Sequence, residues 1–290
     1  MSGALLAAAS GVGFGVFQSL NARAVRGFDD PYLATLVQLF VAAVALSLAA
    51  LVTGELGGLG DAPLWALGDF ALAGLLHFLA GWSMLNLSQK RIGAARTSPL
   101  LTTVPVFGVA IAAVTLGQLP GLIALAAIAV MIAGAYVVAT RDRLGSPRLA
   151  DALPGLTCAF CWALSPVFTL RGLDAVDSPL AGLTVGLLGS VAVYAPLYLL
   201  VRRAPVPSLT GDALGLKLVL GALVGLATWW RWAALEDAEI GIVLALSLLS
   251  VPIVLFLAPV VAGRHLEHVT PRLWAGAGLV VTGALILVVA

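Results

Sequence analysis

The amino-acid sequence predicts an all-α integral membrane protein, with ten transmembrane helices arranged as two inverted five-helix repeats around a central cavity. Three observations support this prediction: an apolar composition, ten apolar stretches of spanning length, and a weak internal repeat. Of the 290 residues, 61% are hydrophobic and only 10% are charged. About a quarter of the residues of a soluble domain are charged, so this chain lacks the polar surface of a soluble protein. Its net charge of +1 gives no basic excess for binding nucleic acid.

The ten apolar stretches have the length that a membrane requires. A hydrocarbon core about 30 Å thick needs roughly 20 apolar residues in a helix, and these stretches lack the polar–apolar alternation of barrel strands. Short segments rich in proline, glycine and charged residues separate them and leave no room for an extramembrane domain. The expected spans cover approximately residues 3–22, 31–53, 64–89, 93–116, 119–140, 150–170, 178–201, 213–235, 240–262 and 271–290.

Basic residues are concentrated on alternate loops, and this asymmetry predicts the orientation. Thirteen fall on one side, whereas only Arg171 and Arg231 fall on the other. Because basic loops face the cytoplasm, we expect a multi-pass protein of the bacterial inner membrane with both termini in the periplasm. If the two spans around Pro120 formed a single span, the orientation of every later span in the membrane would be reversed. The thirteen residues are Arg23, Arg26, Lys90, Arg91, Arg96, Arg141, Arg143, Arg148, Arg202, Arg203, Lys217, Arg264 and Arg272.

The internal repeat appears when the two halves are compared at a shift of about 148 residues. We therefore expect two domains, residues 1–145 and 146–290. Five spans is an odd number, so the second domain must enter the membrane the other way up. Such repeats, with a site between them at the midplane, are typical of secondary transporters. The matching pairs are Pro31 with Pro179, Trp82 with Trp230, Ile92-Gly93 with Ile240-Gly241, Pro105 with Pro252, and Ala133-Gly134-Ala135 with Thr282-Gly283-Ala284.

Ten spans in two halves, an Ile-Gly pair before the fourth and ninth spans, and a proline in each of those spans resemble the drug/metabolite transporter superfamily. Within it the chain is similar to EamA-type exporters, and most similar to the YddG-type exporters of aromatic amino acids. The resemblance covers essentially the whole chain. It implies a secondary transporter that exports amino acids by alternating access. One difference is that Gln118 and Arg264 stand where an acidic residue often follows the fourth and ninth spans.

Polar and aromatic side chains at mid-depth are candidates for a substrate site, because burying polar groups in lipid is costly. Phe14 and Gln18 share one helix face, and Trp229 lies on the same face as Gly225, the counterpart of His77. For each aromatic residue, packing within the bundle is the alternative role. For the prolines, which remove a helical hydrogen bond, a static kink is the alternative. The predicted substrate-binding residues are Phe14, Gln18, Gln38, His77, Ser98, Trp162 and Trp229, and the predicted hinges are Pro105 and Pro252.

The charges inside the spans narrow the class of substrate. No span carries Asp or Glu near its middle, which disfavours cation antiport. Only Arg231 approaches the embedded cation that a phosphate would need. A neutral or zwitterionic substrate fits best, and among such substrates the resemblance implies an amino acid, with aromatic or other apolar side chains favoured. The alternatives are export of another small metabolite or drug and, in a different class, a membrane-embedded enzyme or scaffold.

Other features predict how such a transporter would operate. An unperturbed histidine titrates near neutrality, so His77 is the one plausible proton carrier at mid-depth. Because burial disfavours its charged form, we expect His77 instead to bind a substrate that moves down its own gradient. Without a Walker-type loop, ATP hydrolysis is not expected, and neither are enzyme activity, a cofactor or a metal. The expected partners are a small-molecule substrate and the lipid bilayer. One chain is expected to suffice for transport, with the oligomeric state left open.

Overall fold

The computed structural model describes residues 3–116, 121–139, 149–201, 211–237, 243, 246–263, 267 and 269–289. Within these ranges every regular element is helical, so the prediction of an all-α protein is confirmed. Seven helical stretches are long and apolar enough to cross a membrane, and three shorter apolar helices lie at the remaining expected positions. Several residues used above lie outside the described ranges: Gln118, Arg141, Arg143, Arg148, Arg202, Arg203, Ile240-Gly241 and Arg264.

The helices follow the ten apolar stretches closely. In α2, Asp30 caps the first turn by accepting a hydrogen bond from the Tyr32 N–H (2.8 Å), and Gly54 ends the helix with a φ of +77°. The elements in chain order are α1 (Gly3–Arg26), α2 (Pro31–Thr53), η1 (Glu55–Leu59), α3 (Leu64–Gly74), η2 (Leu75–Gly81), α4 (Trp82–Ile92), α5 (Ala94–Leu101), α6 (Val104–Leu116), α7 (Leu122–Ala139), η3 (Leu149–Asp151), α8 (Leu153–Leu173), α9 (Pro179–Val201), α10 (Gly211–Asp237), α12 (Ser250–Ala262) and α13 (Pro271–Val289).

The third expected span is one continuous helical stretch, but its middle is not α-helical. The segment η2 is a π-helix, which carries His77. Wide turns of this kind are rare and occur often at functional sites. An α-helical wheel therefore does not give the direction of His77 relative to residues that follow it.

The fourth expected span consists of two helices instead of one. Between α5 and α6, Thr102 and Thr103 form a turn, and their hydroxyls donate to the carbonyls of Pro99 and Leu100 (both 2.7 Å). These bonds satisfy carbonyl groups that the interrupted helix leaves without a backbone donor.

The prediction that Pro105 and Pro252 remove helical hydrogen bonds inside spans is wrong. Pro105 lies in the first turn of α6, directly after this break. Pro252 lies in the first turn of α12, which begins after a turn at Leu248 and Leu249. At these positions the missing N–H would have no intrahelical partner in any case. The two chain breaks themselves lie at corresponding points of the two halves.

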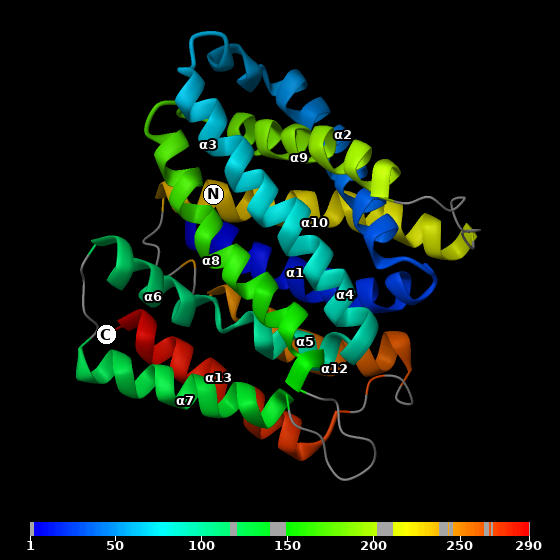
Figure 1. Cartoon of the computed structure of the whole chain (residues 1–290), viewed down its shortest axis with the longest axis vertical. Coiled ribbons are helices and arrows are strands. Elements are labelled where there is room, and N and C mark those ends of the chain that lie inside the picture. Colours follow the sequence, from blue (N-terminus) through cyan, green and yellow to red (C-terminus); the bar gives the residue numbers. More distant parts are fainter. Residues whose placement is uncertain are drawn as a thin grey trace.

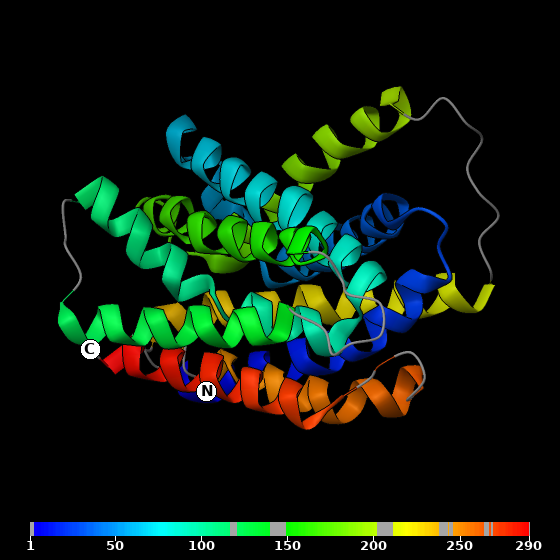
Figure 2. The ribbon, with the colours of Figure 1, turned by 60° about the horizontal axis from the view of Figure 1, so that its bottom comes forward.

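The helices of the two halves pack in a reciprocal pattern. The first helix of the first half, α1, packs against α10 and α12, while the first helix of the second half, α8, packs against α3, α4 and α6. Helices α2 and α9 contact each other, and α7 and α13 lie side by side along one edge of the bundle (Figures 1 and 2). The main apolar core lies among α1, α2, α3, α4, α8, α9 and α10.

The helix ends define two sides of the bundle. Helices α1, α4 and α9 end where α10 begins, at the right of Figure 1. We call this the basic side, because Arg23, Arg26 and Lys90 lie there. The opposite side, here called the acidic side, carries Glu55 and Asp174 at the ends of α2 and α8.

The Ile92-Gly93 pair marks a buried helix cap at the basic side. Gly93 has a φ of +80°, and a Cβ there would lie 2.5 Å from the carboxylate of Glu267. Glu267 Oε1 accepts hydrogen bonds from Arg26 (2.7 Å) and the Ala94 N–H (3.1 Å), and Oε2 accepts one from the Ala95 N–H (3.1 Å). The carboxylate therefore stabilises the positive N-terminal end of α5 and ties it to α1.

Candidate functional site

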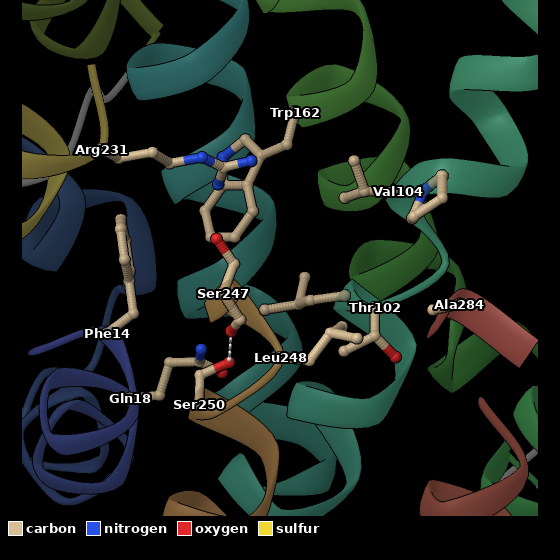
Figure 3. A pocket seen from close by; sticks show the side chains of 12 residues that line it. Phe14, Gln18, Thr102, Val104, Trp162, Arg231, Ser247, Leu248, Ser250 and Ala284 are labelled. Carbon is tan, nitrogen blue, oxygen red and sulfur yellow. Dashed lines mark hydrogen bonds between the residues drawn. The ribbon is translucent and has the colours of Figure 1, made fainter. Parts of the chain in front are cut away.

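A cavity of about 60 Å³ lies near the centre of the bundle (Figure 3). Both halves of the chain contribute to its walls, as the sequence predicted for a transport site. The break between α5 and α6 and the turn before α12 both border it. The lining residues are Phe14, Gln18, Leu101, Thr102, Val104, Pro105, Trp162, Arg231, Ser247, Leu248, Ser250 and Ala284.

One wall of the cavity is aromatic. The rings of Phe14 in α1 and Trp162 in α8 are 6.1 Å apart, with an angle of 59° between their planes. Trp162 is held from behind: its Nε1 donates to the His77 carbonyl (3.2 Å), and its ring stacks on the His77 ring. A Cβ at Gly81 would lie 2.6 Å from Trp162 Nε1, so a glycine at this position makes room for the indole.

His77 supports the aromatic wall and does not itself line the cavity. Its Nδ1 lies 3.2 Å from the Ser165 hydroxyl, and the imidazole is buried. Among the described residues, its Nε2 has no hydrogen-bond partner. His77 therefore fixes the position of Trp162 from the side that faces away from the cavity.

The other wall carries a cation. Figure 3 shows the Arg231 side chain extending from α10 toward Trp162. In the part of the chain that the structure describes, Arg231 makes no hydrogen bond or ion pair, and the lining of the cavity contains no carboxylate. An unpaired guanidinium in a low-dielectric site binds carboxylate or phosphate groups strongly, in a bidentate geometry.

Hydrogen-bond acceptors complete the cavity. Gln18 is buried, and its Oε1 has no partner among the described residues. The hydroxyls of Ser247, Ser250 and Thr102 donate to backbone carbonyls, which leaves their oxygen lone pairs available. The cavity therefore combines one cation, an aromatic wall and several neutral acceptors.

The predicted site residues divide into two groups. Phe14, Gln18, Trp162 and the predicted hinge Pro105 come together in the cavity lining. The other five, including the second hinge, lie outside it. Of these, Ser98 is fully buried in α5 and Trp229 packs against the main apolar core. The residues placed outside the lining are Gln38, His77, Ser98, Trp229 and Pro252.

Sequence reasoning missed Arg231 and Lys217 as buried cations. Arg231 was assigned to the end of a span, but it lies in the central cavity. Lys217 was counted among the basic loop residues, but it is fully buried in α10. Without these two, twelve basic residues remain on one side and one on the other. The polar residues Asn21, Gln38 and Asn86 share the depth of Lys217 in their spans and were the signal that a cation lies among them.

A second hollow, of about 720 Å³, lies between α2, α4 and α9 near the basic side. Exposed apolar side chains such as Leu197 and Val201 form its outer rim. The carboxylate of Asp30 in its lining accepts hydrogen bonds from the Tyr32 N–H and the Tyr198 hydroxyl (3.0 Å). The central cavity is therefore the better candidate for a substrate site, since it presents polar groups without partners.

Comparison with known proteins identifies the family. The sequence model of the EamA-like transporter family matches residues 1–140. These residues, just under half of the chain, belong to the EamA-like transporter family. This EamA-like transporter is thus a multi-pass membrane protein of the drug/metabolite transporter superfamily, which carries small molecules across a bilayer.

Similarity in structure extends beyond the region that the family model matches. A solved structure described as "Crystal structure of protein" superposes on the EamA-like transporter with a TM-score of 0.62. The alignment covers 96% of this chain and 95% of that chain, at 20% sequence identity, and thereby shows a shared fold. No curated protein matches the chain in sequence.

Proposed function

We propose that this EamA-like transporter is a secondary exporter of amino acids, with aromatic or other apolar side chains favoured. The observation that carries the proposal is Arg231, a guanidinium in the central cavity without a carboxylate partner among the described residues. A transport site that holds a lone cation favours a substrate with an anionic group.

The remaining parts of the cavity suit the rest of an amino acid. The rings of Phe14 and Trp162 would contact an aromatic or branched side chain. The unpartnered Gln18 Oε1 would accept a hydrogen bond from the substrate ammonium. A carboxylate on Arg231, an ammonium on Gln18 and an apolar side chain on the rings use the cation, one of the neutral acceptors and the aromatic wall of the cavity.

Binding must widen the cavity. A free volume of about 60 Å³ is well below the roughly 300–1,000 Å³ of ligand pockets. The breaks at Thr102–Thr103 and Leu248–Leu249 border the cavity directly and allow the adjacent helices to change direction. Pro105 and Pro252 next to these breaks are the proposed hinges of alternating access.

The proposed alternating access uses two inverted five-helix repeats, residues 1–145 and 146–290. The reciprocal packing of α1 on α10 and of α8 on α3 and α4 supports this division. The excess of basic residues on one side supports an inner-membrane protein with periplasmic termini. Export then carries substrate from the basic, cytoplasmic side to the acidic side.

The proposal is tested by uptake into proteoliposomes, with labelled amino acids compared with sugars and organic cations. We expect transport of amino acids with apolar side chains, competed by unlabelled aromatic amino acids and not by sugars. Each transported amino acid is then compared with its carboxamide, which lacks the anionic group, and with its keto acid, which lacks the ammonium. Transport of cations or sugars in preference to all carboxylates would overturn the proposal.

A further inference from the structure

A lysine is fully buried in the bundle, on the basic side of the cavity. Lys217 lies six residues after the start of α10, and none of its surface is exposed. Its Nζ donates to Gln38 Oε1 (2.6 Å), to Asn86 Oδ1 (3.1 Å) and to Asn21 Oδ1. The three N–H groups of the ammonium thus meet three amide oxygens from α2, α4 and α1.

None of these partners carries a negative charge. In the part of the chain that the structure describes, Lys217 forms no ion pair. A buried charge is normally paired, because its desolvation costs several kcal/mol, and amide oxygens compensate it only by their dipoles. Neutral side chains could cross-link these helices, so a lysine at this position points to a use for an amino group that three amide oxygens surround.

The three amides around Lys217, those of Asn21, Gln38 and Asn86, are linked to the central cavity. Gln89 Nε2 donates to the backbone carbonyl of Gln18, which lines the cavity, and Gln89 Oε1 accepts from Asn21 Nδ2 (2.7 Å). Asn21 is a partner of Lys217. Three hydrogen bonds in series therefore connect Gln18 in the cavity lining with Lys217, which lies toward the basic side.

Side-chain hydrogen bonds link the helices at this depth. Asn86 Nδ2 in α4 donates to Thr35 in α2 (2.8 Å), and Asn21 Nδ2 in α1 donates to Asn86 Oδ1 (2.8 Å). Closer to the basic side, the Tyr198 hydroxyl of α9 donates to Asp30 ahead of α2. These bonds join α4 to α1 and α2, and α9 to the start of α2, on the basic side of the cavity.

We propose that Lys217 is a second carboxylate-binding group on the transport path, held by Asn21, Gln38 and Asn86 while the basic side is closed. When that side opens, α4 moves away from α1, α2 and α10. Asn86 then leaves the ammonium, and a substrate carboxylate takes its place. The exchange replaces a neutral acceptor with a charged one, which forms a stronger hydrogen bond. This inference rests on the proposed function, because it requires a substrate with a carboxylate.

The test measures the KM of transport separately from each side, in membrane vesicles of known sidedness. Lys217→Gln removes the charge but retains a hydrogen-bonding side chain, and Lys217→Arg retains the charge. Lys90→Gln is the matched control, because Lys90 lies on the same side and also donates to carbonyl oxygens, those of Phe28 (2.6 Å) and Asp29 (2.5 Å). Each variant is assayed with an amino acid and with its carboxamide.

We expect Lys217→Gln to raise the KM for the amino acid at least about tenfold when it is offered to the basic side. The KM from the acidic side and both KM values for the carboxamide should stay close to those of the wild type. Lys217→Arg and Lys90→Gln should retain the preference for the carboxylate. An equal loss for amino acid and carboxamide, or from both sides, would mean that Lys217 only stabilises the bundle.

Two other outcomes are distinguished: a Lys217→Gln variant that does not fold, and a wild type that does not transport carboxylates. If Lys217→Gln does not fold, a folded Lys217→Arg variant that transports but no longer prefers the amino acid over its carboxamide overturns the inference. If the wild type transports no carboxylate at all, the proposed function fails first. A wild type that transports amino acids, combined with a folded Lys217→Gln variant that keeps the wild-type preference for the amino acid over its carboxamide from the basic side, refutes only the role of Lys217.

Discussion

The imidazole of His77 lies parallel to the indole of Trp162, with 5.2 Å between the ring centroids and 12° between the planes. The same indole donates its N–H to the backbone carbonyl of His77. Trp162 faces the cavity with Phe14 on its other side, whereas His77 is buried behind it. His77 therefore acts on a substrate through the position of Trp162.

We first predict that His77 and Trp162 are energetically coupled. His77→Gln should raise the KM for an aromatic substrate, because the indole loses its stacking partner. In a Trp162→Ala background the same change should have little further effect. A double-mutant cycle of KM values measures this coupling. Additive effects of the two substitutions would place His77 in direct contact with substrate instead.

Energy coupling gives a second prediction. Among the described residues, no carboxylate lines the cavity, and His77 lies behind the wall, so substrate should move down its own gradient. Counterflow and net flux in proteoliposomes should be the same with and without an imposed pH gradient. Accumulation against the gradient that requires proton flow and disappears in His77→Gln would make proton coupling the correct mechanism.

A third prediction concerns Arg231. Arg231→Gln should raise the KM for a carboxylate substrate about 10- to 100-fold, because a charge-assisted hydrogen bond contributes about 1.5–3 kcal/mol. Arg231→Lys should recover part of this loss, since it keeps the charge without the bidentate geometry.

The control for Arg231 is Arg171→Gln. Arg171 in α8 is exposed, pairs with the buried Asp69 (3.4 Å) and does not line the cavity. This variant should transport like the wild type. If Arg171→Gln and Arg231→Gln reduce transport equally, the position of Arg231 in the cavity has no special role.

Two tryptophans should behave differently, which is the fourth prediction. Trp162→Ala removes part of the cavity wall and should reduce transport while the folded yield stays high. Trp229 packs against the apolar core and not in the lining. Trp229→Ala should therefore lower the free energy of unfolding by about 1–3 kcal/mol, and with it the melting temperature. The KM should stay near the wild-type value. Transport assays and thermal unfolding of the two purified variants distinguish these roles.

The fifth prediction compares two glycines with positive φ, +77° at Gly54 and +80° at Gly93. Their ψ angles differ: at 4° Gly54 is left-handed helical, whereas at 168° Gly93 is in a region that essentially only glycine adopts. A Cβ at Gly54 would meet nothing within 4 Å, whereas one at Gly93 would meet the Glu267 carboxylate. Gly54→Ala should cost about 1–2 kcal/mol from the left-handed backbone alone.

Gly93→Ala should cost more, by about 1–3 kcal/mol, because alanine adopts the Gly93 backbone conformation less readily and because the new Cβ displaces the carboxylate that caps α5. Thermal unfolding of both variants in detergent measures the difference. Equal melting temperatures for Gly54→Ala and Gly93→Ala would show that neither effect adds a cost.

Much of the fold could be predicted from the sequence, because membrane spans are determined by local composition. The apolar run 31–53 coincides with α2, and the run 271–290 begins where α13 begins. The π-turn at His77 and the break at Thr102–Thr103 could not be predicted, because hydropathy reports burial and not the hydrogen-bonding pattern of the backbone.

The candidate site was predicted in part, for a related reason. Phe14, Gln18 and Trp162 stand out as aromatic or polar residues at mid-depth in their spans. The burial of Lys217 depends on Asn21, Gln38 and Asn86, which are 131 to 196 residues away in sequence. Near the end of an apolar run, a lysine with such partners has the same local pattern as a lysine that snorkels to the interface.

The partners of α1 have a consequence for how the protein is made. Ser10 in α1 donates to the carbonyl of Ala227 (2.7 Å), which follows it by 217 residues. At a synthesis rate of about 5–20 residues per second, the ribosome needs roughly 10–40 s to reach that partner. During this interval α1 is already synthesised, but Ser10 and Asn21 lack their hydrogen-bond partners in α10. Insertion of the early spans therefore precedes their final packing, and the polar groups of α1 need temporary partners from the insertion machinery, water or neighbouring nascent helices.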